Sequence, residues 1–125
     1  MKDLTKSEEQ LMQILWKMGK GFVNDIIEYI PDPKPAYNTV STIIRILEKK
    51  GFVSHKSYGK TYEYFPLITK DEYSSKTLDR FVNNYFDNSY KNLVSFFTKE
   101  DNIPVKELEA IKKMIEDELN NKNKK

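Results

Sequence analysis

The chain has 125 residues, of which 38% are hydrophobic and 32% are charged, with a formal net charge of +2. This length suits one domain, or one small domain with an appendage. Because cysteine is absent and His55 is the one histidine, disulfides, zinc-thiolate sites and thiol nucleophiles are excluded, and we expect no metal and no cofactor. No apolar run approaches the roughly 20 residues of a membrane span, and the N-terminus turns polar at once, so we expect a cytoplasmic protein without membrane insertion.

Apolar side chains at helical spacing predict a first helix over residues 5–18. Thr5 or Ser7 is expected to cap it, and Gly19 to end it. Met12 and Trp16 lie off the apolar stripe. The expected core face consists of Leu11, Ile14, Leu15 and Met18.

Two further helices and a hairpin are predicted next. A second helix fits residues 23–29 and is broken by three prolines within 31–35, which cannot continue a helix. A third helix is expected from about Tyr37 to Lys50, with Asn38 as N-cap. Two β-rich runs, 52–58 and 61–67, flank the turn Gly59-Lys60 and predict a hairpin. This order of three helices and a hairpin within about 68 residues is typical of a winged helix-turn-helix domain.

The remaining residues, 69–125, are predicted to be wholly helical. Three apolar stripes are separated by polar breaks at 87–89 and at 101–104. The expected fold is therefore mainly α with a small β-hairpin. It comprises an N-terminal winged-helix DNA-binding domain over 1–68 and a C-terminal helical dimerisation region over 69–125.

Positive charge is concentrated between residues 37 and 60. This segment holds five basic residues against Glu48 alone, a net +4, so the rest of the chain sums to −2. Opposite its core stripe, the third helix carries residue types that hydrogen-bond base edges or approach the groove floor. The predicted base-reading residues are Asn38, Ser41, Thr42 and Arg45. The predicted contacts to the DNA backbone are Thr39, Lys49, Lys50, Lys56, Tyr58 and Lys60.

Other functions are compatible with parts of this pattern. A polar outer face is common on surface helices, and winged-helix modules that bind only protein exist, so an adaptor without specific DNA binding is the main alternative. A non-specific architectural DNA-binding protein is a third. The chain lacks nucleophile-elbow, zincin and phosphate-loop motifs, so we expect no catalytic site and no enzyme.

The C-terminal region indicates a homodimer. Three amphipathic helices of this length cannot easily close a core alone. The predicted interface consists of Phe81, Tyr85, Phe86, Tyr90, Leu93, Phe97, Leu108, Ile111 and Ile115. The alternative is that its aromatic side chains pack on the chain's own N-terminal domain.

Three stretches of the chain carry a family resemblance: Leu4–Trp16 (LTKSEEQLMQILW), Tyr37–Val53 (YNTVSTIIRILEKKGFV), and Leu93-Val94 followed by Phe97–Asp101 (FTKED). Together they resemble the BlaI/MecI/CopY family of penicillinase repressors. The resemblance spans about residues 4–119. It implies a homodimeric repressor of pseudo-palindromic operators, often with TACA/TGTA-type half-sites, that an inducing signal releases from DNA.

The same resemblance suggests two modes of induction. In the β-lactam branch, a membrane sensor-metalloprotease leads to cleavage of the repressor at an Asn-Phe bond. The nearest segment here is Ser95, Phe96 and Phe97, which lacks the asparagine and is the candidate cleavage region. In the copper branch, paired Cys-x-Cys motifs take up metal, and this does not carry over to a chain without cysteine.

Overall fold

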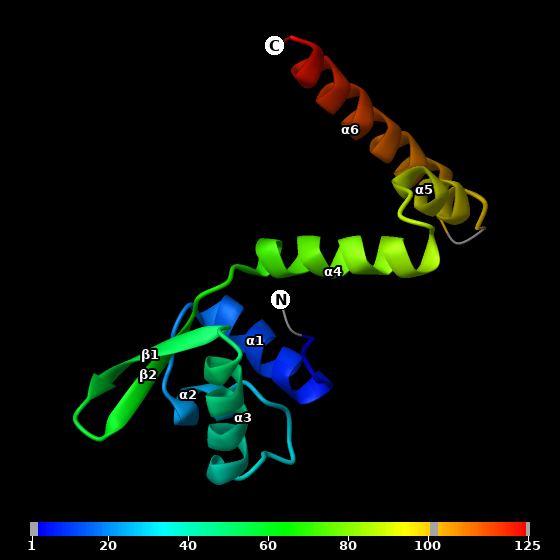
Figure 1. Cartoon of the computed structure of the whole chain (residues 1–125). Coiled ribbons are helices and arrows are strands. Elements are labelled where there is room, and N and C mark those ends of the chain that lie inside the picture. The colour runs from blue at the N-terminus through cyan, green and yellow to red at the C-terminus, as the bar shows by residue number, and fades with distance from the viewer. Residues whose placement is uncertain (1–2, 101–102, 125) are drawn as a thin grey trace. The chain divides into compact units, whose positions relative to one another are not determined.

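The computed structural model describes residues 3–100 and 103–124, and its helices and hairpin are shown in Figure 1. The elements in chain order are α1 (Lys6–Met18), α2 (Val23–Glu28), α3 (Tyr37–Lys49), β1 (Val53–Tyr58), β2 (Thr61–Pro66), α4 (Lys70–Tyr85), α5 (Tyr90–Thr98) and α6 (Val105–Asn123). The chain divides into two compact units, one reaching to Thr77 and the other starting at Leu78. The predicted fold class is confirmed. Asp101 and Asn102, which form part of the predicted break before Pro104, lie outside the described residues.

Local side-chain chemistry sets the ends of the first two helices. The Thr5 hydroxyl accepts from the Glu8 amide at 3.2 Å while the Glu8 carboxylate accepts from the Thr5 amide at 2.9 Å, a reciprocal cap at the start of α1. Gly19 ends α1 with a φ of 86°, a conformation that suits a residue without Cβ. Beyond α2, the Lys34 ammonium donates to the carbonyl of Ile30 at 2.8 Å and to those of Ile27 and Glu28 at 3.2 Å. A cation thus closes the carbonyl end of this short helix.

The third helix starts one residue earlier than the predicted cap. Its N-cap is Ala36, which has no capping side chain, and Asn38 lies inside the first turn. The expectation that Asn38 caps the helix is wrong, and its amide stays available on the exposed side. Lys50 occupies the C-cap position, and Gly51 follows with a φ of 85°.

The hairpin is antiparallel, and Val53 pairs with Pro66 at its base and Tyr58 with Thr61 at its tip. Gly59 turns the chain with a φ of 63°. Gly21, between α1 and α2, exchanges two backbone hydrogen bonds of 2.8 and 2.9 Å with Tyr64. Strand β2 is therefore hydrogen-bonded to the segment between α1 and α2, and Figure 1 shows the hairpin beside the helices of the N-terminal unit.

One core holds α1, α2, α3 and the hairpin together. It contains Leu11, Leu15, Ile26, Val40, Ile44, Leu47, Phe52 and Val53, each with at most 2% of its surface exposed. Met12 is fully buried in the same core, so its predicted place off the core face is wrong. A well-packed core of this kind positions the outer side of α3 rigidly.

The first turns of α4 belong to the N-terminal unit. Tyr73 is buried, with its ring centroid 5.7 Å from that of Trp16 and 5.8 Å from that of Phe52. The Trp16 indole donates to the carbonyl of Ile68 at 2.8 Å. The compact unit therefore ends at Thr77, nine residues beyond the predicted boundary at 68.

The C-terminal unit contains the rest of α4, α5 and α6. Val82 is the one buried residue in its described part. Asp87 and Asn88 turn the chain between α4 and α5 with φ values of 52° and 59°. Within the described part of the chain, every helix is too short or too polar to cross a membrane.

Candidate nucleic-acid interface

The outer side of α3 carries most of the predicted base-reading residues. Asn38, Thr42, Arg45 and Lys49 are exposed, and we call them the recognition face. Val40, Ile44 and Leu47 are buried on the opposite side. Ser41 departs from the prediction, because it is only 6% exposed and cannot reach a base edge. We therefore remove Ser41 from the base-reading set.

Hydrogen bonds within the helix define what the recognition face can offer. The Thr42 hydroxyl donates to the Asn38 carbonyl at 2.8 Å, so its proton is occupied while its lone pairs and methyl group remain available. Arg45 has five donors in a planar fork that matches guanine, and the Asn38 amide can pair with adenine. The face therefore offers two side chains that can each form paired hydrogen bonds to a base, with a small side chain between them.

A surface hollow lies along this side of α3. Thr42, Arg45, Ile46, Glu48 and Lys49 line it. Ile46 is 40% exposed there, as an apolar contact for a thymine methyl requires. Glu48, the single acid of the basic segment, also borders the hollow. One acid thus stands next to the base-reading side chains.

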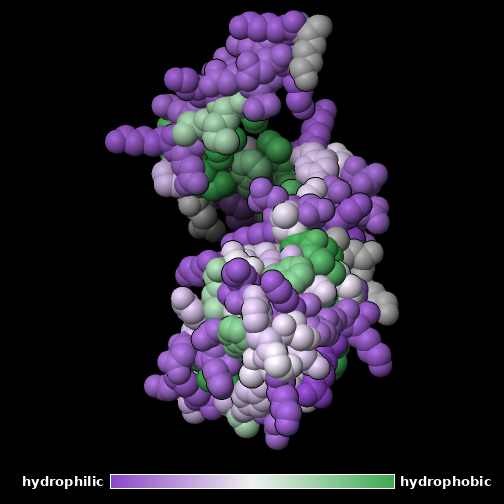
Figure 2. Space-filling view, turned by 90° about the vertical axis from the view of Figure 1, so that its left-hand side faces the viewer, coloured by the Kyte–Doolittle hydropathy of each residue, from purple (hydrophilic) through white to green (hydrophobic). Residues whose placement is uncertain are grey.

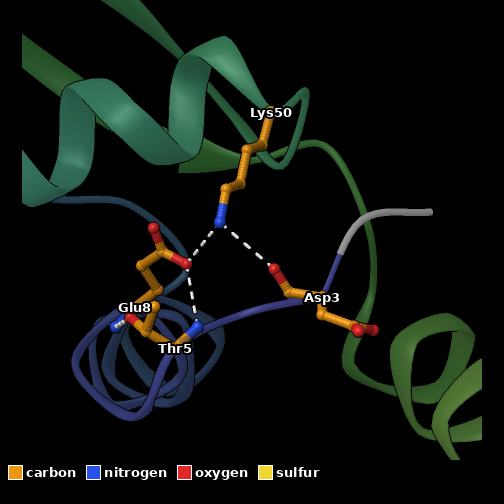
Figure 3. Close-up of polar contacts among 4 residues, drawn as sticks. All are labelled: Asp3, Thr5, Glu8 and Lys50. Atoms are coloured by element: carbon orange, nitrogen blue, oxygen red, sulfur yellow. Dashed lines mark hydrogen bonds and ion pairs between the residues drawn. The ribbon is translucent and has the colours of Figure 1, made fainter.

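The Lys50 side chain points toward Glu8 and the backbone carbonyl of Asp3 (Figure 3). Its ammonium donates to Glu8 Oε1 at 2.7 Å and to the Asp3 carbonyl at 3.1 Å. The Lys50 side chain is 22% exposed and that of Glu8 is 6% exposed. The prediction of a phosphate contact is therefore corrected, because Lys50 joins the end of α3 to the start of α1. Lys49, its neighbour, is exposed and stays a candidate for phosphate contact.

Glu8 is held ionised by these contacts. Burial by itself raises the pKa of the carboxyl, but the Lys50 ammonium and the hydrogen bonds from Thr5 outweigh it and leave the pKa below its ordinary value. Within its own helix, Glu8 is a first-turn acid that completes the cap with Thr5. Its partner Lys50 lies 42 residues away, and no local pattern indicates that pairing.

The hairpin supplies exposed basic and aromatic side chains near its tip. Lys56, Tyr58 and Lys60 are all exposed, as is Thr39 in the first turn of α3. The Lys56 ammonium lies 5.3 Å from the centre of the Tyr58 ring, and Tyr58 packs edge-on against Phe22 at 5.9 Å. These four residues remain the candidates for backbone contact, together with Lys49.

The inner face of the hairpin brings together residues that were not predicted to interact. His55 Nδ1 lies 2.6 Å from Glu48 Oε2, and the His55 ring stacks on Tyr62 with centroids 4.2 Å apart. Strand alternation could have indicated this group, because His55 and Tyr62 fall on the same face as the buried Tyr64. These contacts connect the hairpin to the last turn of α3.

Every predicted dimer-interface residue is exposed or half-buried in the single chain. Tyr85 is 73% exposed, Ile115 50%, and Phe81 44%. Phe97 on α5 and Leu108, Ile111 and Ile115 on α6 line one apolar groove with Val94. Figure 2 shows apolar side chains gathered on the C-terminal unit among polar ones. The groove is a surface on which further apolar side chains can pack.

The candidate cleavage region lies inside a helix. Ser95, Phe96 and Phe97 fall within α5, and Phe96 is 56% exposed. A helical segment must open locally before a protease can act on it. Exposure alone therefore does not make this segment a substrate.

The chain is similar to known repressors over most of its length. Residues 4–117 match the family model described as penicillinase repressor. The methicillin resistance regulatory protein MecI of Staphylococcus aureus (strain N315) is 27% identical over 114 residues, covering 90% of this chain and 93% of MecI. A penicillinase repressor of Staphylococcus aureus is 27% identical over 116 residues, covering 92% of each chain. The solution structure of the DNA-binding domain of the repressor BlaI superposes with a TM-score of 0.50 and 26% identity, covering 58% of this chain and 94% of that domain.

Proposed function

Because this chain belongs to the penicillinase repressor family, we propose that it is a sequence-specific DNA-binding repressor that acts as a homodimer on a pseudo-palindromic operator and is released by an inducing signal. The family is one of transcriptional repressors rather than enzymes. The observation that carries the proposal is the recognition face, which stands exposed on α3 in a domain similar to that of BlaI.

The protein makes two kinds of contact with DNA, one to the bases and one to the phosphates. Arg45 and Asn38 read base edges in the major groove, and Thr42 lets α3 approach them closely. Lys49, with Lys56 and Lys60 of the hairpin, contacts phosphates and sets the register. The phosphate contacts make binding steeply salt-dependent.

The small number of DNA contacts that one winged-helix domain can make favours a dimer. One winged helix contacts few phosphates, so a monomer binds weakly at physiological salt. In a dimer, the second winged-helix domain binds its half-site at high effective concentration. This raises the affinity for the operator without any new kind of contact. The exposed apolar side chains of the C-terminal unit support such pairing, because a single chain leaves them in water.

Release then requires only that the dimer loosen. Any signal that separates the two C-terminal regions lowers operator affinity, because each winged-helix domain must then bind DNA alone. Cleavage within 95–97 by a membrane sensor-protease system is one such signal, and it needs α5 to open first.

Footprinting against the DNA upstream of the protein's own gene, with a salt titration, tests the proposal. We expect a protected palindrome with half-sites one or two helical turns apart and a steep loss of binding as salt rises. Protection without a preferred site indicates an architectural protein. An absence of DNA binding at low salt indicates the protein-interaction adaptor.

A further inference from the structure

The hairpin needs support to act as a wing. A two-stranded hairpin is only marginally stable in isolation. Gly59 lies four residues beyond His55, so the tip extends roughly 13 Å past that residue at the rise of an extended strand. A small change of angle near His55 therefore moves Lys60 relative to α3 by a distance that matters for contact with a phosphate.

A side-chain contact at His55 provides that support. Because an ionised carboxylate only accepts hydrogen bonds, His55 Nδ1 donates to Glu48 Oε2 over the 2.6 Å between them. The His55 side chain is 28% exposed and that of Glu48 is 31% exposed, so water competes only partly with this bond. The bond joins β1 directly to the last turn of α3.

Aromatic packing fixes the His55 ring in place. It stacks on Tyr62 at 4.2 Å with an interplanar angle of 22°, and its centroid lies 5.5 Å from that of the buried Tyr64. The three rings follow the inner face of the hairpin from the core toward the tip. The His55 ring therefore packs against two aromatic side chains of the hairpin, while its Nδ1 is hydrogen-bonded to Glu48 of α3.

The position of Glu48 gives the contact a second consequence. Glu48 borders the same hollow as Arg45 and Lys49. A carboxylate without its His55 partner could pair with either cation and repel nearby phosphates. The hydrogen bond keeps the carboxylate directed to the hairpin, which leaves Arg45 available for a base.

We propose that His55, held by Glu48 and Tyr62, is a positioning residue that sets the wing relative to the recognition helix and thereby contributes to operator specificity. This inference rests on the proposed function, since it concerns how the same DNA interface is held. His55 acts through its neighbours and need not touch DNA.

The experiment uses the full chain and a duplex selected by the wild type from a random-sequence pool. His55→Phe retains an aromatic ring for Tyr62 but removes the donor to Glu48. We expect it to weaken binding of the selected duplex about tenfold, as for loss of one charge-assisted hydrogen bond, and binding of a random duplex much less. Hydroxyl-radical protection by the wing should be lost, while guanine protection by α3 persists.

A double-mutant cycle separates positioning from a general effect on stability. In a Glu48→Ala background, His55→Phe should change affinity less than about twofold, because its partner is already gone. Ser57→Ala, at an exposed position on the same face of β1, is the matched control and should retain both affinity and wing protection. If His55→Phe does not fold, Glu48→Ala alone should remove the wing protection.

Two results would overturn the inference. One is unchanged wing protection in His55→Phe and in Glu48→Ala. The other is an equal loss of affinity from His55→Phe with and without Glu48. A wild type that selects no sequence from the pool would contradict the proposed function, sequence-specific DNA binding, rather than the role of His55.

Discussion

The Lys50 ammonium, at the C-terminal end of α3, donates a 2.7 Å hydrogen bond to the buried carboxylate of Glu8, in the first turn of α1. The same carboxylate oxygen accepts from the Thr5 amide. One acid therefore caps its own helix and anchors the end of the recognition helix. Lys49 and Lys50 are adjacent basic residues, yet only Lys49 remains available to DNA.

This difference predicts opposite effects for two neighbouring substitutions. Lys50→Ala leaves a buried carboxylate without its cation and should lower the free energy of unfolding by about 2 kcal/mol. Lys49→Ala should leave stability nearly unchanged but weaken DNA binding and reduce the salt slope by about one. Urea unfolding and salt-titrated DNA binding of both variants provide the check. Equal stability losses would contradict the assignment.

The lowered pKa of Glu8 predicts a stability difference that depends on pH. A carboxyl with a lower pKa in the folded state contributes stability above its unfolded pKa and loses it as pH falls through the folded pKa. Wild type should therefore exceed Glu8→Gln in unfolding free energy near neutral pH, and the gap should close as the pH falls below the ordinary range of a glutamate carboxyl. Urea titrations of both proteins across that range measure it. A gap that widens on acidification would show that the sign is wrong.

Arg45 should determine one base position of the operator. Arg45→Ala should cost about 1–3 kcal/mol of binding free energy and relax specificity at a single base pair. Arg45→Lys keeps the charge but not the planar fork, so most of the specificity loss should persist while the salt slope stays close to wild type. Binding to a panel of single-base operator variants tests this, with Lys17→Ala on α1 as a basic, exposed control. Parallel losses on every duplex would assign Arg45 to a phosphate instead.

Local sequence signals predicted the elements well because the forces behind them are local. The Thr5–Glu8 cap, the proline-rich break after α2 and the turn at Gly59 each act within a few residues. Helical periodicity also agrees with the burial of Val40, Ile44 and Leu47 on one side of α3. It misplaced Ser41, whose burial depends on what packs beside α3. It could not indicate the Lys50–Glu8 or His55–Glu48 pairs, because each joins residues on different elements.

Packing between residues far apart in the sequence also sets the extent of the N-terminal unit, and this leads to a stability prediction. Tyr73 packs between Trp16 and Phe52, which precede it by 57 and 21 residues in the sequence. Tyr73→Ala should therefore lower the unfolding free energy of the N-terminal unit by about 3 kcal/mol, as large-to-small core substitutions do. Tyr85→Ala, at a position on α4 that is 73% exposed, is the matched control and should leave that unit unaffected. Trp16 fluorescence follows the unfolding of this unit selectively, since Trp16 is the one tryptophan.

The groove between α5 and α6 allows a direct test of the dimer. Ile115 is 50% exposed and lines the groove with Phe97 and Leu108. If a second copy covers this surface, Ile115→Glu buries an unpaired carboxylate and should raise the dimer dissociation constant by about 100-fold or more. Operator binding should then need correspondingly higher protein concentrations.

Ala110→Glu is the matched control for this substitution. It introduces the same side chain on the opposite side of α6, so the net charge changes by the same amount. Sedimentation equilibrium should report a dimer for Ala110→Glu and mainly monomer for Ile115→Glu, with Trp16 fluorescence showing the N-terminal unit folded in both. A monomeric Ile115→Glu that bound the operator as tightly as wild type would separate dimerisation from DNA binding. One winged-helix domain would then bind the operator alone, and separating the dimer would not release the protein from DNA.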